Sequence, residues 1–193
     1  MLLVVGLRNP GARYEGSRHN VGGDVVTLLG ERHGATFKKA RRFIRAEVAE
    51  TRFGDARVIL ALPRTFMNES GQAVAPLFKY YKVELEAMLV VHDDIDLPFA
   101  KLRVQLGGGS GGNNGVGSVA RSMGRPAFWR LKCGVGRPPG SMDPADYVLR
   151  PFHSRERENA GVMVQLAADV VEAFVSSGGE AARQRAGELN TLG

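Results

Sequence analysis

The sequence contains a single cysteine, Cys133, among its 193 residues. An intramolecular disulfide and a zinc site made of several cysteines are therefore excluded, and a reducing, cytoplasmic location is expected. The chain also lacks internal repeats, a low-complexity tail and an uninterrupted apolar run of the roughly 18 residues that a membrane helix needs. The apolar residues 1–7 are too few for a signal peptide and follow no basic leader, so we expect no membrane segment and no cleaved leader.

The composition is that of a globular protein, with 44% hydrophobic and 24% charged residues. A chain of this length can bury a sizeable core, and we expect one domain covering residues 1–193. The formal net charge is +6. A basic surface suits a polyanionic partner, with nucleic acid as the first candidate, although many basic proteins bind none.

Apolar runs alternate with amphipathic segments along the chain. Strands are expected at 2–7, 44–51, 57–62, 88–91, 102–106 and 128–135, and helices at 21–29, 73–81, 116–123 and 162–174. Pro76 lies inside the second helical pattern, which predicts a late start or a kink there. We therefore expect a single-domain three-layer α/β/α sandwich with a mixed, mostly parallel twisted sheet.

Four polar clusters follow expected strands: Asn9, the segment 66–68, Asp93 and the segment 107–114. Because ligands bind at the carboxyl ends of parallel strands, we expect these clusters to meet at one edge of the sheet. His19 lies in a polar loop near the first cluster. It is either a surface histidine or a general base, since an ordinary histidine pKa of about 6.5 suits proton transfer near neutral pH. A nearby carboxylate would fix its tautomer and favour its protonated form.

Each cluster also has an alternative interpretation. The acidic run His92-Asp-Asp-Ile-Asp96 is either a solvated turn or a divalent metal site. The glycine-rich segment 107–115 resembles a flexible linker in composition, but a helix start after it favours an oxyanion, and it lacks the lysine of a nucleotide-binding P-loop. Phe66 and Met67 either anchor a loop or bind a base or peptide. The dispersed Arg and Lys residues form either a solvated face or a track for RNA phosphates.

Six segments together resemble the bacterial peptidyl-tRNA hydrolase family. They occur in family order across almost the whole chain: Val5-Gly-Leu-Arg-Asn-Pro-Gly11, Tyr14 to Asn20 with Gly22, Thr65-Phe-Met-Asn-Glu-Ser-Gly71, Val91-His-Asp-Asp-Ile-Asp-Leu-Pro98, Gly107 to Gly115, and Phe128 to Pro138. Members of that family cleave the ester between a peptide and the 3′ end of tRNA without a metal or organic cofactor. The resemblance therefore implies a cofactor-independent hydrolase of translation that binds the acceptor stem and 3′ end of peptidyl-tRNA. Because no long exposed apolar stripe demands a partner, we also expect a monomer without an obligate protein partner.

The resemblance also implies roles for individual residues. His19 would activate water, and Asp93 would stabilise the protonated histidine. On chemical grounds, the catalytic set is completed by an N–H donor to the developing oxyanion, either the Asn114 amide or a backbone group of the glycine segment. The residues implied for binding the peptide end of the substrate are Asn9, Tyr14, Phe66, Met67, Asn68 and Asn114. Lys132 stands where the family has an arginine that clamps a tRNA phosphate, so the clamp is either weaker here or replaced by Arg103.

Three further positions depart from the family pattern. Arg8 replaces a glycine, Gln105 replaces a lysine of the phosphate clamp, and Asn113 replaces a histidine. These changes bear on substrate discrimination more than on hydrolysis. Two alternatives stay open: a non-catalytic RNA-binding module on the same scaffold, and a metal-dependent phosphoesterase that uses the acidic run.

Overall fold

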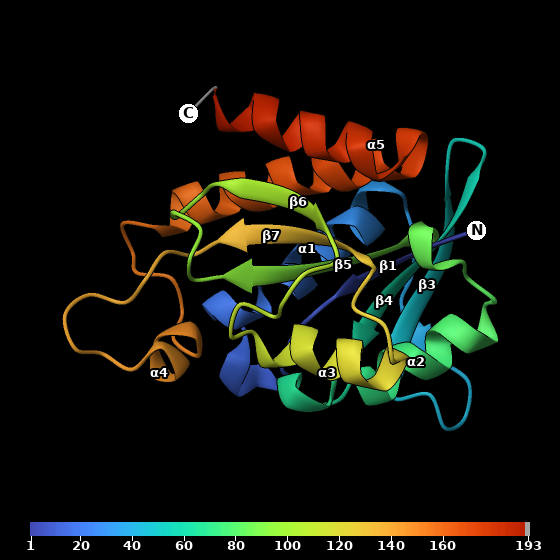
Figure 1. Ribbon diagram of the computed structural model, residues 1–193, viewed down its shortest axis with the longest axis horizontal. Helices are drawn as coiled ribbons and strands as arrows, with labels where there is room; N and C mark the ends of the chain where they lie inside the picture. The colour runs from blue at the N-terminus through green and yellow to red at the C-terminus, as the bar shows by residue number, and fades with distance from the viewer. Residues whose placement is uncertain (192–193) are drawn as a thin grey trace.

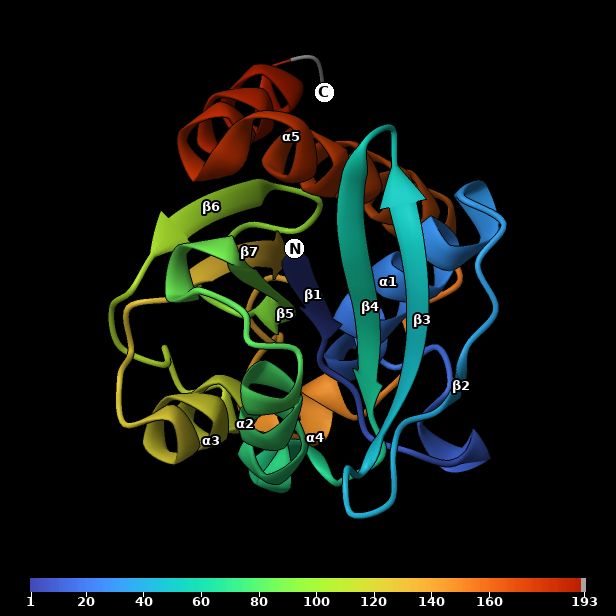
Figure 2. The same ribbon diagram turned by 90° about the vertical axis from the view of Figure 1, so that its right-hand side faces the viewer.

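The computed structural model describes residues 1–191. They form a seven-stranded sheet in the order β2-β3-β4-β1-β5-β7-β6, with helices on both faces (Figures 1 and 2). The strands are β1 (Leu2–Gly6), β2 (Lys38–Lys39), β3 (Ala46–Phe53), β4 (Ala56–Pro63), β5 (Met88–Asp94), β6 (Leu102–Leu106) and β7 (Trp129–Gly134). The helices are α1 (Val21–Arg32), α2 (Gly71–Tyr80), α3 (Asn114–Met123), α4 (Pro144–Val148) and α5 (Arg157–Asn190), with 3-10 turns η1 (Ala12–Tyr14), η2 (Arg18–Asn20), η3 (Met67–Glu69) and η4 (Leu85–Ala87). The expected α/β/α sandwich is confirmed.

The sheet is mixed, as expected. Its four central strands, β4, β1, β5 and β7, are parallel to their neighbours within that group. The outer pairings β2–β3, β3–β4 and β6–β7 are antiparallel. The direction of β6 matters for the site, because the segment after β6 starts at the opposite end of the sheet from the carboxyl ends of the central strands.

Two apolar cores lie on the two faces of the sheet. Leu3 and Val5 of β1 face the core beneath α2 and α3, whereas Val4 faces the core beneath α1 and α5. Alternate residues of a strand point to opposite faces, so a strand covered on both sides is apolar throughout. This explains why the first apolar run has no polar interruption.

A glycine contact fixes where α1 begins. A Cβ atom on Gly22 would lie 2.1 Å from the Val91 carbonyl oxygen, and one on Gly6 would lie 2.3 Å from the Gly22 carbonyl oxygen. Only glycine at both positions allows α1 to pack this closely on β1 and β5. The loop before α1, which contains His19, is thereby held at the carboxyl end of β5.

Three local expectations need correction. Helix α2 begins at Gly71 and contains Pro76, so of the two predicted outcomes the late start is wrong. Its buried Ala73, Val74 and Leu77 pack against the sheet and offset the backbone hydrogen bond that Pro76 cannot make. Strand β5 extends to Asp94 through continuous pairing with β7, so Asp93 lies within the strand and not after it. Helix α4 was not predicted, and Asp143 caps it by accepting a hydrogen bond from the Ala145 N–H.

Helix α5 is long and apolar enough to span a membrane by length and composition alone. In the fold it is a core helix, because Met163, Val170 and Phe174 are buried against the sheet. Its backbone is non-helical at Gly178 (φ 84°, ψ −177°), which separates two helical halves. The second half covers β6 and β7, where Gly179 leaves room for the Trp129 ring.

Candidate active site

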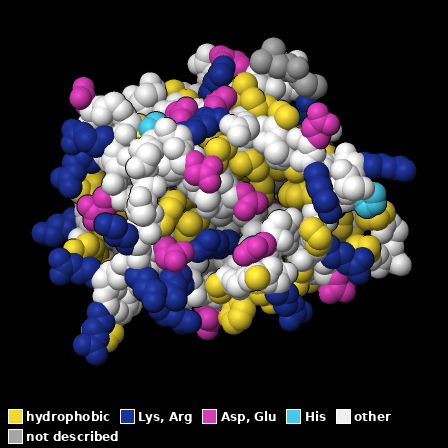
Figure 3. All heavy atoms as spheres, turned by 180° about the vertical axis from the view of Figure 1, so that it is seen from behind, with side chains coloured by type: hydrophobic (Ala, Val, Ile, Leu, Met, Phe, Trp, Pro, Cys, Tyr) yellow, Lys and Arg dark blue, Asp and Glu magenta, His cyan; other side chains and the backbone are white. Residues whose placement is uncertain are grey.

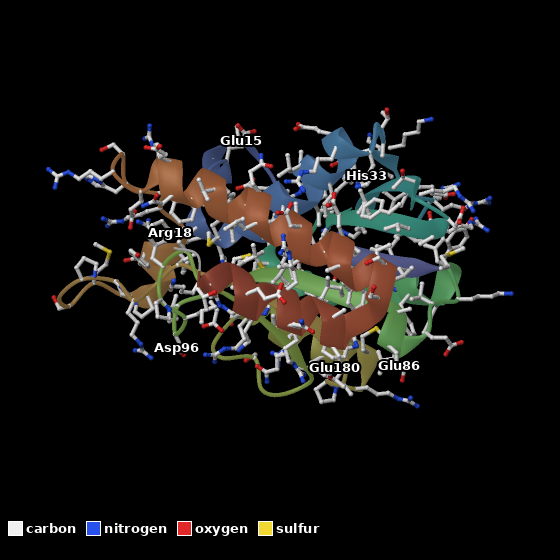
Figure 4. The ribbon with its side chains drawn as sticks, turned by 90° about the horizontal axis from the view of Figure 1, so that it is seen from above. Glu15, Arg18, His33, Glu86, Asp96 and Glu180 are labelled. Carbon is white, nitrogen blue, oxygen red and sulfur yellow. The ribbon has the colours of Figure 1, made fainter. Side chains whose placement is uncertain are left out.

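A cavity of about 650 Å³ opens at the carboxyl ends of the central strands. Four residues predicted to act on substrate line it from the segment between β1 and α1 and from the end of β5: Asn9, Tyr14, His19 and Asp93. Four more line it from the loops before α2 and at the start of α3: Phe66, Met67, Asn68 and Asn114. Figure 4 shows Arg18 and Asp96 at this same end of the molecule, with His33 and Glu86 toward the other end. The fold therefore gathers eight predicted residues around one space.

His19 and Asp93 form the polar centre of the cavity. The His19 Nδ1 atom lies 2.8 Å from the Asp93 Oδ1 atom, and the two residues are 8% and 3% exposed. An ionised carboxylate only accepts hydrogen bonds, so Nδ1 carries the proton in this pair. Nε2 is then the ring nitrogen that can take a proton from water in the cavity.

Asn113 holds Asp93 from the other side. Its Nδ2 donates to the Asp93 Oδ1 atom (2.9 Å) and to the Asp93 carbonyl oxygen (3.2 Å). Its Oδ1 accepts hydrogen bonds from the backbone N–H groups of Gly115 and Val116 and so caps α3. Sequence reasoning noted Asn113 only as a departure from the family. An asparagine directly before a helix was the available signal for the capping role, but nothing local indicated the contact with Asp93.

Asn9 is held by hydrogen bonds to two residues that lie elsewhere in the sequence, Asn20 and Met67. Its Oδ1 accepts a hydrogen bond from the Met67 N–H (2.8 Å). The Asn20 side chain accepts from the Asn9 N–H (2.8 Å) and donates to the Asn9 carbonyl oxygen (3.0 Å). With Oδ1 engaged by the backbone, the Asn9 amide presents its Nδ2 donors for other contacts. Asn20 was not predicted to contribute.

The outer part of the cavity is more exposed. Phe66 is 53% exposed, and its ring meets Tyr14 edge-on with centroids 6.4 Å apart. Asn68 and Asn114 are also exposed. An aromatic face and two free amides at the mouth can bind a ligand that has both a flat apolar part and hydrogen-bonding groups.

The glycine segment reaches the cavity by an unexpected route. Since β6 is antiparallel to β7, Gly107 starts at the far end of the sheet, and the segment crosses the sheet face back toward Asp93. The fully buried Arg130 pins it by donating to the carbonyl oxygens of Gly107 and Gly109. A Cβ atom on Gly108 would lie 2.8 Å from an Arg130 guanidinium nitrogen. Arg130 is therefore a structural residue, and its burial removes it from both a solvated basic face and a track for RNA phosphates.

The acidic run divides between two faces of β5. Asp94 pairs with Lys132 (3.0 Å), and Asp96 pairs with Arg137 on the surface. His92 is buried, its Nδ1 donates to the Asp93 carbonyl oxygen (2.7 Å), and burial lowers its pKa to about 4. Within residues 1–191 there is no cluster of three or more His, Cys, Asp or Glu side chains arranged for a metal ion. The side chains proposed as metal ligands point to separate partners.

Basic residues are dispersed over the surface, and Figure 3 shows them most densely at one edge of the visible face. Neither Arg103 nor Lys132 lines the cavity. They are register partners on β6 and β7, so their side chains share one face of the sheet. Lys132 is 14% exposed in its side chain and tied to Asp94, whereas Arg103 is exposed. Arg8, which replaces the family's glycine, pairs with Glu47 (2.6 Å).

Arg18 joins the His19 loop to the segment after α4. Its guanidinium donates to the Pro151 carbonyl oxygen (2.8 Å) and pairs with Glu156 (2.6 Å). It also lies 4.1 Å from the centroid of the Tyr147 ring. A buried arginine with these partners fixes the position of α4, which supplies one wall of the cavity.

Several known proteins are similar to this chain in sequence and fold. Residues 3–191 match the family described as peptidyl-tRNA hydrolase. The chain is 49% identical over 183 residues to a peptidyl-tRNA hydrolase of Frankia casuarinae, covering 95% of this chain and 92% of that protein. It is 47% identical over 190 residues to one from Kineococcus radiotolerans, covering 95% of each chain. The crystal structure of peptidyl-tRNA hydrolase from Acinetobacter baumannii superposes with a TM-score of 0.90 at 33% identity, covering 96% of this chain and 94% of that one. The chain belongs to the peptidyl-tRNA hydrolase family.

Proposed function

We propose that this protein hydrolyses the ester bond between a peptide and the 3′ end of tRNA, with His19 as the general base. The 2.8 Å contact between His19 and Asp93 inside the cavity carries the proposal. Family membership supports the reaction class, and the basic net charge of +6 suits an RNA-linked substrate.

The reaction follows from the ring nitrogen that faces the cavity. Nε2 of His19 takes a proton from water as the water oxygen attacks the ester carbonyl carbon. Asp93 accepts the Nδ1–H hydrogen bond throughout, so the imidazolium that forms lies beside a negative charge. The Asn114 amide or a backbone N–H of the glycine segment donates to the developing oxyanion. The imidazolium then returns the proton to the departing 3′ oxygen of the tRNA.

The remaining cavity residues bind the substrate. The free Nδ2 of Asn9 donates to the blocked amino end of the peptide and disfavours a free aminoacyl group, whose ammonium ion offers no acceptor. Asn68 binds the peptide backbone, Phe66 and Tyr14 offer ring faces and edges, and Met67 lines the groove. On the tRNA side, the exposed Arg103 makes the main phosphate contact and Lys132 a secondary one.

We also propose that the chain acts in the cytoplasm as a single-domain monomer, without a metal, an organic cofactor or a protein partner. Sedimentation at micromolar concentration tests the monomer. Full activity in excess chelator is expected, whereas loss of activity restored by a divalent cation would favour the phosphoesterase alternative.

A direct assay tests the function. The purified protein is incubated with an N-acetylated aminoacyl-tRNA and, separately, with the same tRNA carrying a free amino group. Rapid deacylation of the acetylated substrate and slow deacylation of the free one are expected. Tight tRNA binding without any release at high protein concentration would instead identify an RNA-binding module.

A further inference from the structure

The buried amide of Asn113 bridges two parts of the site. Its Nδ2 lies 2.9 Å from the Asp93 Oδ1 atom, the same oxygen that meets His19 at 2.8 Å. Its Oδ1 lies 3.0 and 3.1 Å from the N–H groups of Gly115 and Val116. The amide has one orientation, because only its oxygen can accept from these two donors and only its nitrogen can donate to a carboxylate.

The Asp93 carboxylate has few other neighbours that could orient it. Asp94, the next residue, points to Lys132 on the other face of β5. Cys133, the register partner of Asp93 on β7, is buried, and burial raises the pKa of its thiol so that it stays uncharged. Among residues 1–191, the hydrogen bonds to the Asp93 carboxylate come from His19 and Asn113. During the reaction the His19 ring gains and loses a proton at Nε2, whereas the Asn113 amide keeps the same charge and the same donors.

From this arrangement we propose that Asn113 is a positioning residue that holds the Asp93 carboxylate against Nδ1 of His19, and thereby keeps the Nε2 atom unprotonated and directed at water. The inference rests on the proposed function. The group that positions the carboxylate is then a neutral donor. The Asn113 amide holds Asp93 without adding a positive charge that would disfavour the imidazolium form of His19. The histidine that the family typically has here could add such a charge when protonated.

The same residue caps α3, so a useful experiment must separate the two roles. Serine and threonine are both good helix N-caps, because each offers a hydroxyl oxygen to the first N–H groups of the helix. Neither side chain is long enough to donate to Asp93 as the asparagine amide does, and neither adds a charge beside the carboxylate. Asn113→Ser and Asn113→Thr therefore keep the cap and remove the contact.

We expect both variants to unfold at close to the wild-type temperature and to lose about 10- to 100-fold in kcat, the range for losing a hydrogen bond to a charged group. KM should change much less, because Asn113 is buried and both ends of its amide are already engaged by Asp93 and by the start of α3. Asn113→His, which restores an N–H donor, should recover a large part of the loss. If both cap-competent variants keep wild-type kcat, Asn113 is only a cap and the proposal is overturned.

Two further readouts distinguish positioning from general damage. In an Asp93→Ala background, Asn113→Ser should cause no additional loss in the single-turnover rate, since the carboxylate that it positions is gone. Losses that multiply would contradict the proposal.

The tautomer of His19 can be read from ¹⁵N spectra of the histidine rings, in which the His19 signals are assigned with the His19→Ala variant. These signals should show the Nδ1–H tautomer in the wild type and a mixture of the two tautomers in Asn113→Ser. Unchanged signals in Asn113→Ser would also contradict the proposal.

These outcomes are distinct from failure of the proposed function. If the wild-type protein releases no peptide, the proposed function fails. If the wild type is active and Asn113→Ser and Asn113→Thr are equally active, only the role of Asn113 fails.

Discussion

The inner and outer parts of the cavity differ in how their side chains are held. The inner set, His19, Asp93, Asn9 and Asn113, is buried, and each member has a hydrogen-bond partner within the protein. The outer set, Phe66, Asn68 and Asn114, is exposed. Buried polar groups with satisfied partners are fixed before a ligand arrives, whereas exposed ones are ordered by it. We therefore expect changes in the inner set to lower kcat and changes in the outer set to raise KM.

The largest effect is expected at His19. His19→Ala removes the group that takes a proton from water and should lower kcat by about 10²- to 10⁴-fold, with tRNA affinity nearly unchanged. Steady-state release from N-acetylated aminoacyl-tRNA and a filter-binding assay measure the two quantities. The matched control is His153→Ala, at an exposed histidine. A His19→Ala enzyme as fast as the control would remove the base from the mechanism.

A second buried histidine, His92, tests whether a buried polar residue outside the cavity also contributes to kcat. His92 lies on β5 beside Asp93 but does not line the cavity, and burial lowers its pKa to about 4. In the unfolded chain it binds a proton below its ordinary pKa of 6.5, while the folded protein resists this until about pH 4. The unfolded state thus gains protons first as the pH falls, and the free energy of unfolding decreases across that window.

His92→Gln should lessen this decrease by about 2–3 kcal/mol between pH 7 and pH 4.5, as measured by urea unfolding at both pH values. The variant should keep most of its peptide-release activity at neutral pH. An equal acid loss in variant and wild type would show that His92 does not titrate as described, and a large loss of kcat would move His92 into the inner set.

An intermediate effect is expected in the outer set. Phe66→Ala removes an exposed ring from the cavity mouth and should raise KM by about 5- to 100-fold, the range for losing a base–aromatic stack, with little change in kcat. Phe43 is the control, since it is 86% exposed but does not line the cavity. Steady-state kinetics of both alanine variants decide the matter: a fall in kcat for Phe66→Ala, or an equal rise in KM for both, would break the distinction between the two sets.

The smallest effect concerns tRNA binding outside the cavity. Gln105→Lys adds a cation on β6, on the same face as Arg103. We expect up to about fivefold tighter tRNA binding at low salt, declining as salt rises. Gln184→Lys on the exposed side of α5 adds the same charge elsewhere. Equal gains in both variants would mean that net charge, and not a phosphate contact near Arg103, explains the change.

Much of this site follows from the sequence because it depends on parallel strands. β1 and β5 are apolar on both faces, so their central position and shared direction could be predicted, and with them the meeting of Asn9 and Asp93 near His19. The glycine segment lies at the expected edge, but the reason given for it, that it follows a parallel strand, was wrong. It follows an antiparallel strand whose direction is set by long-range pairing with β7, and it returns across the sheet because Arg130 holds it.

Two contributions could not be predicted because they depend on tertiary contacts. A charged residue in a basic sequence is expected on the surface, yet Arg130 is fully buried between glycine carbonyl oxygens. Of two adjacent asparagines, Asn114 was expected to act, but Asn113 is the one that contacts Asp93, because the start of α3 turns its amide inward. The rotation of that helix start is decided by packing against Met67 and Leu7, beside which only glycine fits at position 115.

The central claim is that His19 and Asp93 act as one unit. Single-turnover rates of peptide release at saturating enzyme should therefore be measured for His19→Ala, Asp93→Ala and the double variant. We expect the double variant to be no slower than His19→Ala alone, because Asp93 acts only through the imidazole. Losses that multiply in the double variant would contradict it.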